Sequence, residues 1–257
     1  RAKEELNIFI IGKYVHLKDS YKSLYEAIYH AGVHNKANVK IKWIDSETIN
    51  KKNVGELLSK AAGILIPGGF GNRGISGKIE AIRHARENQI PFLGICLGMQ
   101  LSIIEFTKNV LKMKNSGSSE FGKHTNNVIS LMTEWSKKNQ KVKRTKENDL
   151  GATMRLGSYP CYIKEKSLAS KVYKKKLIHE RHRHRYEVNP KYRSFIEKKG
   201  LVFSGFSKDK KLLEIIENKN HKWFLGVQFH PELKSKPFKP HPIFFSFIKN
   251  SLINKNA

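Results

Sequence analysis

The sequence has little cysteine, no long apolar run and no recognisable signal peptide. Its two cysteines, Cys96 and Cys161, cannot build a disulfide framework, so we expect a reducing compartment and with it a cytoplasmic location. No apolar run approaches the roughly 20 residues that a bilayer-spanning helix needs, so no membrane association is expected. Because the chain opens with Arg1 instead of Met, we expect a processed chain or a fragment of a longer protein.

Acidic residues are also scarce, because the chain has 22 Asp and Glu against 49 Lys and Arg, and its formal net charge is +27. Such a field attracts nucleic acid, anionic membranes or acidic partners, but it does not determine a fold. The basic residues fall in short clusters, such as Lys51–Lys52 and Lys174–Lys176, which lie in expected loops. Compositional bias explains this spread better than one binding face does. A non-catalytic module that binds RNA or another polyanion remains the alternative, and nonspecific binding at low salt is expected in either case.

What the chain does contain is the pattern of an α/β protein. Hydrophobic residues make up 39% and charged residues 28%, a balance typical of globular domains and not of disordered chains. In the first half, apolar runs predict strands over 7–12, 39–44, 63–66 and 91–94, and helical spacing predicts helices over 24–31, 54–61, 79–85 and 97–106. Strands that alternate with helices predict a parallel sheet covered on both faces.

The second half is less regular. A stretch rich in Lys, Asn and Ser over 112–149 predicts long mobile loops around one strand at 128–132. Closely spaced strands are expected at 201–203, 213–216 and 223–229, followed by a closing helix over 244–252. No repeat and no clear linker divides the chain, so residues 1–257 are expected to form a single domain.

The sharpest local signal is Gly94-Ile95-Cys96-Leu97-Gly98, a Gly-x-Cys-x-Gly pattern between a predicted strand and a predicted helix. This is the pattern of a nucleophile elbow with cysteine in the nucleophile position. The tight turn leaves no room for Cβ atoms at the flanking glycines, and the adjacent helix N-terminus favours thiolate over thiol. The alternative is that Cys96 is a small buried hydrophobe, the common fate of a lone cysteine.

A partner for a cysteine nucleophile is found near the other end of the chain. The segment Gln228-Phe229-His230-Pro231-Glu232 follows an apolar strand, so its histidine and glutamate are expected just past the strand's end. In open α/β sheets, catalytic groups gather beyond the carboxyl ends of the strands. Glu232 is then placed to orient the imidazole, which gives a Cys-His-Glu arrangement.

A third segment is the glycine-rich loop over 67–74, which follows the strand predicted at 63–66. It lacks the Gly-Lys-Ser/Thr ending of a phosphate-binding P-loop and the spacing of a dinucleotide-binding fingerprint. Its N–H groups fit a developing oxyanion better, with Gly69 and Leu97 as the main-chain donors. A turn that requires positive φ at glycine is compatible with this interpretation.

Together these three segments resemble the class I (triad-type) glutamine amidotransferases, and among them the glutaminase domains of CTP synthases. The resemblance covers about residues 6–250, and its most specific part is the basic run within Glu180–Asn189. Further matching segments are 12–14, 19–23, 67–74, 94–100, 153–157 and 227–232. The resemblance implies a flavodoxin-like fold, with a mainly parallel twisted sheet flanked by helices and additional antiparallel strands in the second half.

The resemblance also implies a role for each matching residue. Cys96 is expected to be the nucleophile, His230 the general base and acid, and Glu232 its orienting partner. The oxyanion hole is expected to use Gly69 and Leu97. The glutamine substrate is expected to contact Gly69, Phe70, Leu97, Gln100, Glu120 and Arg185. A guanidinium matches an α-carboxylate in a bidentate manner, and a carboxylate pairs with an α-ammonium group. Arg144–Leu156 corresponds to a mobile lid associated with GTP, and no metal site is implied.

The activity that the resemblance implies is hydrolysis of L-glutamine to L-glutamate and ammonia through a cysteine thioester. An N-terminal amidoligase (synthase) domain, absent from this chain, is expected to use the ammonia to convert UTP to CTP. ATP, Mg²⁺ and UTP are expected only in that missing domain, and no cofactor is expected in this one. GTP is a candidate allosteric activator, and the full-length protein is expected to be a homotetramer.

Leu233 departs from the family pattern, whereas His182 and His184 belong to it but allow a second interpretation. Leu233 replaces the phenylalanine that usually follows His-Pro-Glu, which affects packing and leaves the chemistry intact. His182 and His184 alternate with arginines, so on a strand the histidines share one face and the arginines the other. Two histidines without a nearby cysteine make a poor zinc site, and a solvated or domain-facing surface is expected here. A γ-glutamyl peptidase on the same fold remains a further alternative.

Overall fold

The first half of the described chain alternates strands with helices, as the sequence predicts. The computed structural model describes residues 4–13, 21–131 and 154–256. The strands of this half are β1 (Glu4–Gly12), β2 (Ala37–Asp45), β3 (Gly63–Ile66) and β4 (Phe92–Ile95). Its helices are α1 (Lys22–His34), α2 (Val54–Leu57), α3 (Ile75–Glu87) and α4 (Leu97–Asn109). Helix α2 is shorter than predicted, because it ends at Leu57 and a turn over 58–60 follows.

The second half contains more strands than the sequence predicts. They are β5 (Ser116–Ser118), β6 (Asn126–Leu131), β7 (Arg155–Ile163), β8 (Leu177–His184), β9 (Tyr186–Val188), β10 (Leu201–Phe206), β11 (Leu213–Asn218) and β12 (Phe224–Val227). Its helices are α6 (Leu168–Tyr173), α7 (Arg193–Lys198) and α8 (Pro242–Lys255), with short 3-10 helices η2 (Pro190–Tyr192) and η3 (Pro231–Lys234). The predicted closing helix is α8, and β6, β10, β11 and β12 match predicted strands. Met132, the end of the strand predicted at 128–132, lies outside the described residues.

The larger sheet has a parallel part and an antiparallel part. Its strand order is β2-β1-β3-β4-β12-β11-β10-β7-β8. Neighbours from β2 to β12 pair in parallel, and neighbours from β12 to β8 pair antiparallel. The order 2-1-3-4 followed by one more parallel strand is that of flavodoxin-like folds. A smaller sheet joins β5, β6 and β9. The predicted mixed α/β fold is confirmed.

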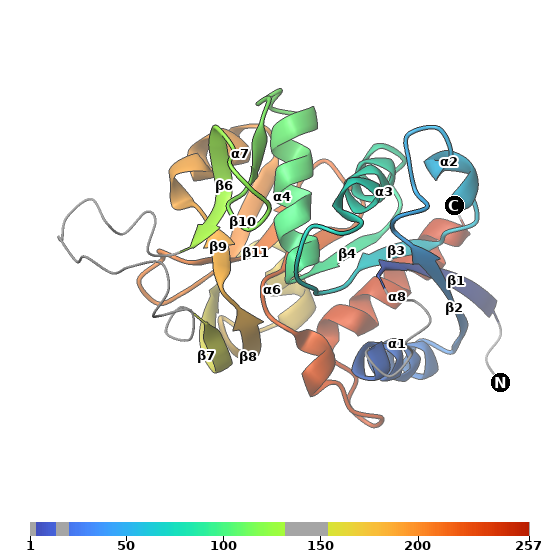
Figure 1. Cartoon of the computed structure of the whole chain (residues 1–257). Helices are drawn as coiled ribbons and strands as arrows, with labels where there is room; N and C mark the ends of the chain where they lie inside the picture. Colours follow the sequence, from blue (N-terminus) through green and yellow to red (C-terminus); the bar gives the residue numbers. More distant parts are fainter. Residues whose placement is uncertain (1–3, 14–20, 132–153, 257) are drawn as a thin grey trace.

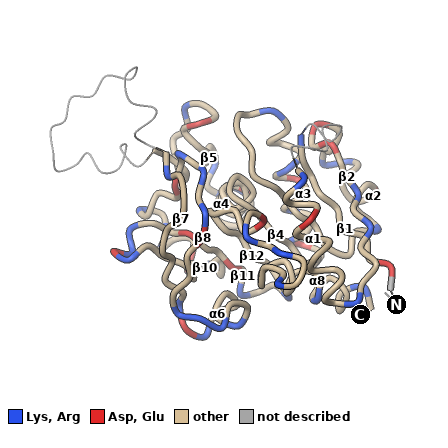
Figure 2. Tube along the Cα trace, turned by 90° about the horizontal axis from the view of Figure 1, so that it is seen from below, with Lys and Arg blue, Asp and Glu red and all other residues tan. Residues whose placement is uncertain are grey.

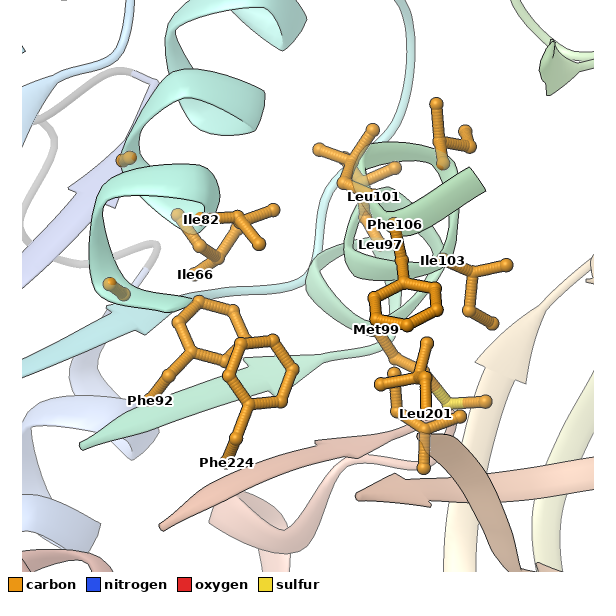
Figure 3. Close-up of a cluster of buried hydrophobic side chains, with 14 of the residues drawn as sticks. Ile66, Ile82, Phe92, Leu97, Met99, Leu101, Ile103, Phe106, Leu201 and Phe224 are labelled. Carbon is orange, nitrogen blue, oxygen red and sulfur yellow. The ribbon is translucent and has the colours of Figure 1, made fainter. Parts of the chain in front are cut away.

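Helices cover both faces of the larger sheet, as Figure 1 shows. Ile66 and Phe92 belong to the core that packs under α3 and α4, whereas Leu65 and Leu93 belong to the core under α1 and α8. This division follows from the alternation of side chains along a strand. In Figure 3 the rings of Phe92 and Phe224 lie stacked, with their centroids 4.4 Å apart, beside the apolar side chains of α4. The two cores fix the carboxyl ends of β3, β4 and β12 relative to one another.

Basic side chains are spread over the molecule. Figure 2 shows Lys and Arg on loops and elements from one end of the described chain to the other. This arrangement agrees with a compositional origin of the +27 charge better than with one polyanion-binding face. No helix within the described residues is both long enough and apolar enough to cross a membrane.

Candidate active site

The turn between β4 and α4 holds a single residue, Cys96. Its main chain adopts φ 52° and ψ −103°, a conformation that is strained for a residue with a side chain. A hydrogen bond stabilises this strained conformation: the N–H of Cys96 donates to the carbonyl oxygen of Val227 across 2.7 Å. A side-chain carbon at Gly98 would lie 2.2 Å from the main-chain oxygen of Ile66, and one at Gly94 would lie 2.7 Å from Gly98. The flanking glycines are therefore required by close packing, as the sequence predicts.

His230 lies past the end of β12, in contact with the carboxylate of Glu232. Its Nδ1 is 2.7 Å from Oε1 of Glu232, and its main-chain N–H donates to the carbonyl oxygen of Arg181 across 2.8 Å. Burial alone would lower the pKa of His230, but its interactions with Cys96 and Glu232 raise that pKa to about 10. With Nδ1 bound to the carboxylate, Nε2 is the imidazole nitrogen left for chemistry.

The loop after β3 packs directly against this pair. A side-chain carbon at Gly68 would lie 2.8 Å from Cε1 of His230, and one at Gly69 would lie 3.6 Å from Cδ2 of Leu97. The loop is held by the buried Lys13, whose Nζ donates to the carbonyl oxygen of Phe70 across 2.5 Å. The two predicted oxyanion donors, Gly69 and Leu97, are therefore neighbours in the structure.

These segments line one pocket with a volume of about 330 Å³, at the lower end of the range for small-molecule sites. Five of the predicted site residues line it: Gly69, Phe70, Cys96, His230 and Glu232. The other lining residues are Tyr21, Ser23, Leu24, Pro67, Gly68, Arg183 and Leu233. Cys96 is only 3% exposed and belongs to the core under α1 and α8, but it also borders this pocket.

The remaining predicted residues, Leu97, Gln100, Glu120 and Arg185, are not among the residues that line this pocket. Glu120 accepts a hydrogen bond from the N–H of Gly71 across 2.9 Å, which places its carboxylate against the glycine-rich loop. The side-chain amide of Gln100 is buried, and its Nε2 donates to the carbonyl oxygen of Tyr186 across 3.0 Å. Arg185 precedes Tyr186 in the bend between β8 and β9, and its buried Nε has no hydrogen-bond partner among the described residues.

The basic run of the sequence forms β8 and the bend after it. His182 and His184 share one face, as predicted, but this face is buried, so the expectation of a solvated or domain-facing surface is wrong for the histidines. Burial, followed by the charge of Arg155, lowers the pKa of His182 to about 2 and that of His184 to about 3. Both rings are therefore neutral, and neutral imidazoles can be buried at modest cost when they are hydrogen-bonded.

The lid expected at Arg144–Leu156 falls mostly outside the described residues. Only its last residues are described, and Arg155 and Leu156 begin β7. Arg155 is buried and forms ion pairs with Glu187 across 3.2 Å and with Glu214 across 2.8 Å. No group of three or more His, Cys, Asp or Glu within the described residues is placed to hold a metal ion.

Sequence reasoning assigned no individual role to several residues that shape the pocket. Lys13 holds the glycine-rich loop, Gly68 contacts His230, and Arg183 lines the pocket. Gln228 was part of the His-Pro-Glu segment, but its contact with Cys96 was not anticipated. Its position directly after the apolar strand, two residues before His230, was the available signal.

The comparisons with known proteins agree with this geometry. The profile of the family described as glutamine amidotransferase class-I matches residues 16–250. The chain is 60% identical over 247 residues to CTP synthase from Pelagibacter ubique, covering 96% of this chain and 46% of that protein. It is 54% identical over 251 residues to CTP synthase from Aquifex aeolicus, covering 97% of this chain and 45% of that protein. The chain thus spans about half the length of these curated relatives.

A solved structure gives the same result at the level of the domain. The glutaminase domain of Trypanosoma brucei CTPS, solved with bound acivicin, superposes with a TM-score of 0.87 at 35% sequence identity. The match covers 96% of this chain and 94% of that one. The chain therefore belongs to the class I glutamine amidotransferases, as a glutaminase domain of the CTP synthase type.

Proposed function

We propose that this chain hydrolyses L-glutamine to L-glutamate and ammonia through a thioester on Cys96. The observation that carries the proposal is the convergence of three distant segments on one pocket, where Cys96 meets His230 and Glu232 beside Gly69. Membership of the glutamine amidotransferase family supports the choice of substrate. A cysteine next to an imidazole that a carboxylate orients is the arrangement of an activated nucleophile.

The reaction begins with the proton of Cys96 on His230, whose raised pKa keeps the imidazole protonated, and the thiolate attacks the side-chain amide carbon of glutamine. A C–S bond forms, and the amide oxygen takes up the negative charge of the tetrahedral intermediate. The main-chain N–H groups of Gly69 and Leu97 stabilise this oxygen. Leu97 is the first residue of α4, so its N–H has no partner within the helix and is available to the substrate.

His230 then returns the proton to the amide nitrogen, the C–N bond breaks, and ammonia leaves. A γ-glutamyl thioester remains on Cys96. Water gives a proton to His230 and attacks the thioester carbon, which breaks the C–S bond and releases glutamate. Glu232, bound to Nδ1, keeps the imidazole in the orientation that both proton transfers need.

We assign recognition of the α-amino acid end of glutamine to Gln100, Glu120 and Arg185. The guanidinium of Arg185, with its Nε unpartnered among the described residues, suits the α-carboxylate. The carboxylate of Glu120, held beside the glycine-rich loop, suits the α-ammonium group. Both N–H bonds of the Gln100 amide are directed at protein oxygens, so its carbonyl oxygen is the atom left for the substrate.

At the level of the whole protein, we propose that the ammonia passes to a synthase domain that converts UTP to CTP with ATP and Mg²⁺. The support is that relatives named CTP synthase are about twice as long as this chain and match it over one half. A homotetramer and activation by GTP belong to the same proposal. We expect slow basal turnover by this chain, and vigorous turnover that ignores both GTP and a supplied synthase domain would contradict the coupling.

The test is ammonia release from L-glutamine by the chain and by two cysteine variants. Cys96→Ala should abolish release, whereas Cys161→Ala, the matched control, should retain it. A diazoketone analogue of glutamine should label Cys96 and leave the buried Cys161 unmodified. Labelling of Cys161 alone, cleavage of γ-glutamyl peptides in preference to glutamine, or sequence-selective RNA binding without ammonia release would each overturn the proposal.

A further inference from the structure

The side chain of Gln228 is a buried polar group next to the nucleophile, with no role in the reaction described above. It is 0% exposed, and it stands just past β12, where its main-chain N–H donates to the carbonyl oxygen of Glu214 across 2.9 Å. Its Nε2 lies 3.7 Å from Sγ of Cys96, which is hydrogen-bond distance for a sulfur acceptor. Burying an amide is costly unless each end finds a partner, so the partners of this side chain indicate what it does.

The polarity of the amide is fixed by a main-chain carbonyl. The oxygen of Tyr186 can only accept, so the side chain of Gln100 must direct its Nε2 toward it, across 3.0 Å. The same Nε2 donates to Oε1 of Gln228 across 3.1 Å. Because Oε1 of Gln228 is held by this bond, the N–H groups of Gln228 are the ones that face Cys96.

The carbonyl of Tyr186 is itself held in place from the other side. His184 lies with Nδ1 3.1 Å from this oxygen, and Nδ1 of His182 lies 2.9 Å from Nε2 of His184. Because both imidazoles are neutral, each has one donor and one acceptor nitrogen. His184 therefore donates through Nδ1 to Tyr186 and accepts at Nε2 from His182. A continuous series of hydrogen bonds leads from the buried face of β8 to Cys96.

We propose that Gln228 is a further catalytic residue, which donates a hydrogen bond to the sulfur of Cys96 and stabilises it as a thiolate. The inference rests on the proposed role of Cys96 as the nucleophile. A hydrogen bond to an ionised acceptor is roughly twice as strong as one to a neutral acceptor. The amide therefore favours the thiolate over the thiol. It exchanges no proton itself, so it takes no part in the proton transfers assigned to His230.

The hydrogen bond also constrains the sulfur within the strained turn. Cys96 and Gln228 come from the ends of the adjacent parallel strands β4 and β12, which pair with Ile95 opposite Val227. The register of these two strands places the amide beside the sulfur before any substrate binds. Gln228 then acts on the resting enzyme, and its effect is measurable without glutamine.

The test uses Gln228→Glu and Gln228→Met in the full 257-residue chain. Gln228→Glu keeps an oxygen for Gln100 and replaces the donor facing Cys96 with a second oxygen. Gln228→Met keeps the length of the side chain and removes both polar atoms. The measurement is the rate at which iodoacetamide alkylates Cys96 between pH 5 and pH 9, read by peptide mass spectrometry. Cys161 is the internal control, because its thiol stays protected while the chain remains folded.

We expect the alkylation profile of Gln228→Glu to move upward by about one pH unit or more. Gln228→Met should move in the same direction by less, since it adds no charge. Gln89→Glu, an equivalent change at a surface amide bound to Asn220, should leave the profile unchanged. Profiles of both Gln228 variants that superpose on that of the unchanged chain would overturn the proposal.

The experiment distinguishes failure of this proposal from failure of the glutaminase assignment. If the unchanged chain releases no ammonia but the alkylation profile still responds to Gln228→Glu, the hydrogen bond stands and the proposed function fails. If ammonia is released normally and the profile does not respond, only the role of Gln228 fails. If Cys161 becomes alkylated in Gln228→Glu, that variant has opened, and the profile of Gln228→Met decides.

Discussion

The main-chain N–H of His230 donates to the carbonyl oxygen of Arg181 across 2.8 Å, which ties the loop of the reactive histidine to β8. The buried face of β8 carries Glu180, His182 and His184 where an ordinary strand would carry apolar residues. The position of His230 therefore depends on a polar layer whose protonation matters to the stability of the fold.

We expect the stability of the chain to fall steeply as the pH drops below about 6.5. The folded-state pKa values of His182 and His184 are about 2 and about 3, below the ordinary value, so the unfolded chain binds protons that the folded chain does not. Their stabilising contribution is complete above the unfolded pKa and is lost as the pH falls. Each histidine lowers the free energy of unfolding by up to about 1.4 kcal/mol for each pH unit below its unfolded pKa. Urea unfolding at pH 5 and pH 6 measures this slope.

The control for this slope is a histidine on the exposed face of the same strand. His182→Gln should reduce the difference in unfolding free energy between pH 5 and pH 6, whereas His179→Gln should leave it unchanged. The raised pKa of His230 acts in the opposite direction, but only above pH 6.5, because below that value both states carry its proton. An equal slope in the unchanged chain and in His182→Gln would show that the buried pair does not govern acid stability.

Gly68→Ala should reduce turnover without unfolding the chain. The added carbon would lie 2.8 Å from Cε1 of His230, closer than such atoms approach, so the imidazole must move away from its place between Cys96 and Glu232. A shift of about 1 Å in a catalytic group costs on the order of 100-fold in rate. The measurement is kcat for ammonia release beside the thermal midpoint. Gly55→Ala, where nothing lies within 4 Å of the added carbon, is the control and should keep full activity.

The parallel part of the fold could be predicted because burial there follows the apolar pattern. Strand β3 is buried at every residue, and α1 buries Leu24, Ala27, Ile28 and Ala31 at the expected spacing. Strand β7 could not be recognised, because it contains Gly157 and Pro160 and pairs with a strand whose buried face is polar. Hydrophobic periodicity contains no signal for a face that is buried through hydrogen bonds and ion pairs.

In the site, too, residues that belong to a local sequence pattern could be predicted, and residues brought in by distant contacts could not. Cys96 and its glycines form a local pattern, and so do His230 and Glu232, because strand ends and tight turns restrict the sequence. Lys13 lies 57 residues from Phe70, the residue it holds, and no local rule connects a lysine after β1 with a loop after β3. Such contacts depend on how the strands are ordered, which the sequence pattern alone leaves undetermined.

Lys13→Met should lower kcat for glutamine hydrolysis by roughly tenfold, less than the 10²–10³ loss typical for removal of an oxyanion donor. The ammonium group of Lys13 holds the carbonyl of Phe70, so its loss releases the loop that positions the N–H of Gly69. The methionine fills similar space, which limits the damage to packing. Lys52→Met, a change at an exposed lysine, should leave kcat unaltered. A normal kcat in Lys13→Met would show that the loop holds its shape without this contact.

Arg185→Gln should raise the KM for glutamine by roughly 30-fold or more and change kcat much less. The guanidinium is the group assigned to the α-carboxylate, and removing one partner of a desolvated charge pair costs about 2 kcal/mol or more. Arg181→Gln is the matched control, because that side chain is exposed on β8 and only its main-chain carbonyl holds His230. Steady-state ammonia release over a range of glutamine concentrations separates the two parameters. A fall in kcat at constant KM would place Arg185 outside substrate recognition, because a residue that only binds the α-carboxylate acts equally on the bound substrate and on the transition state.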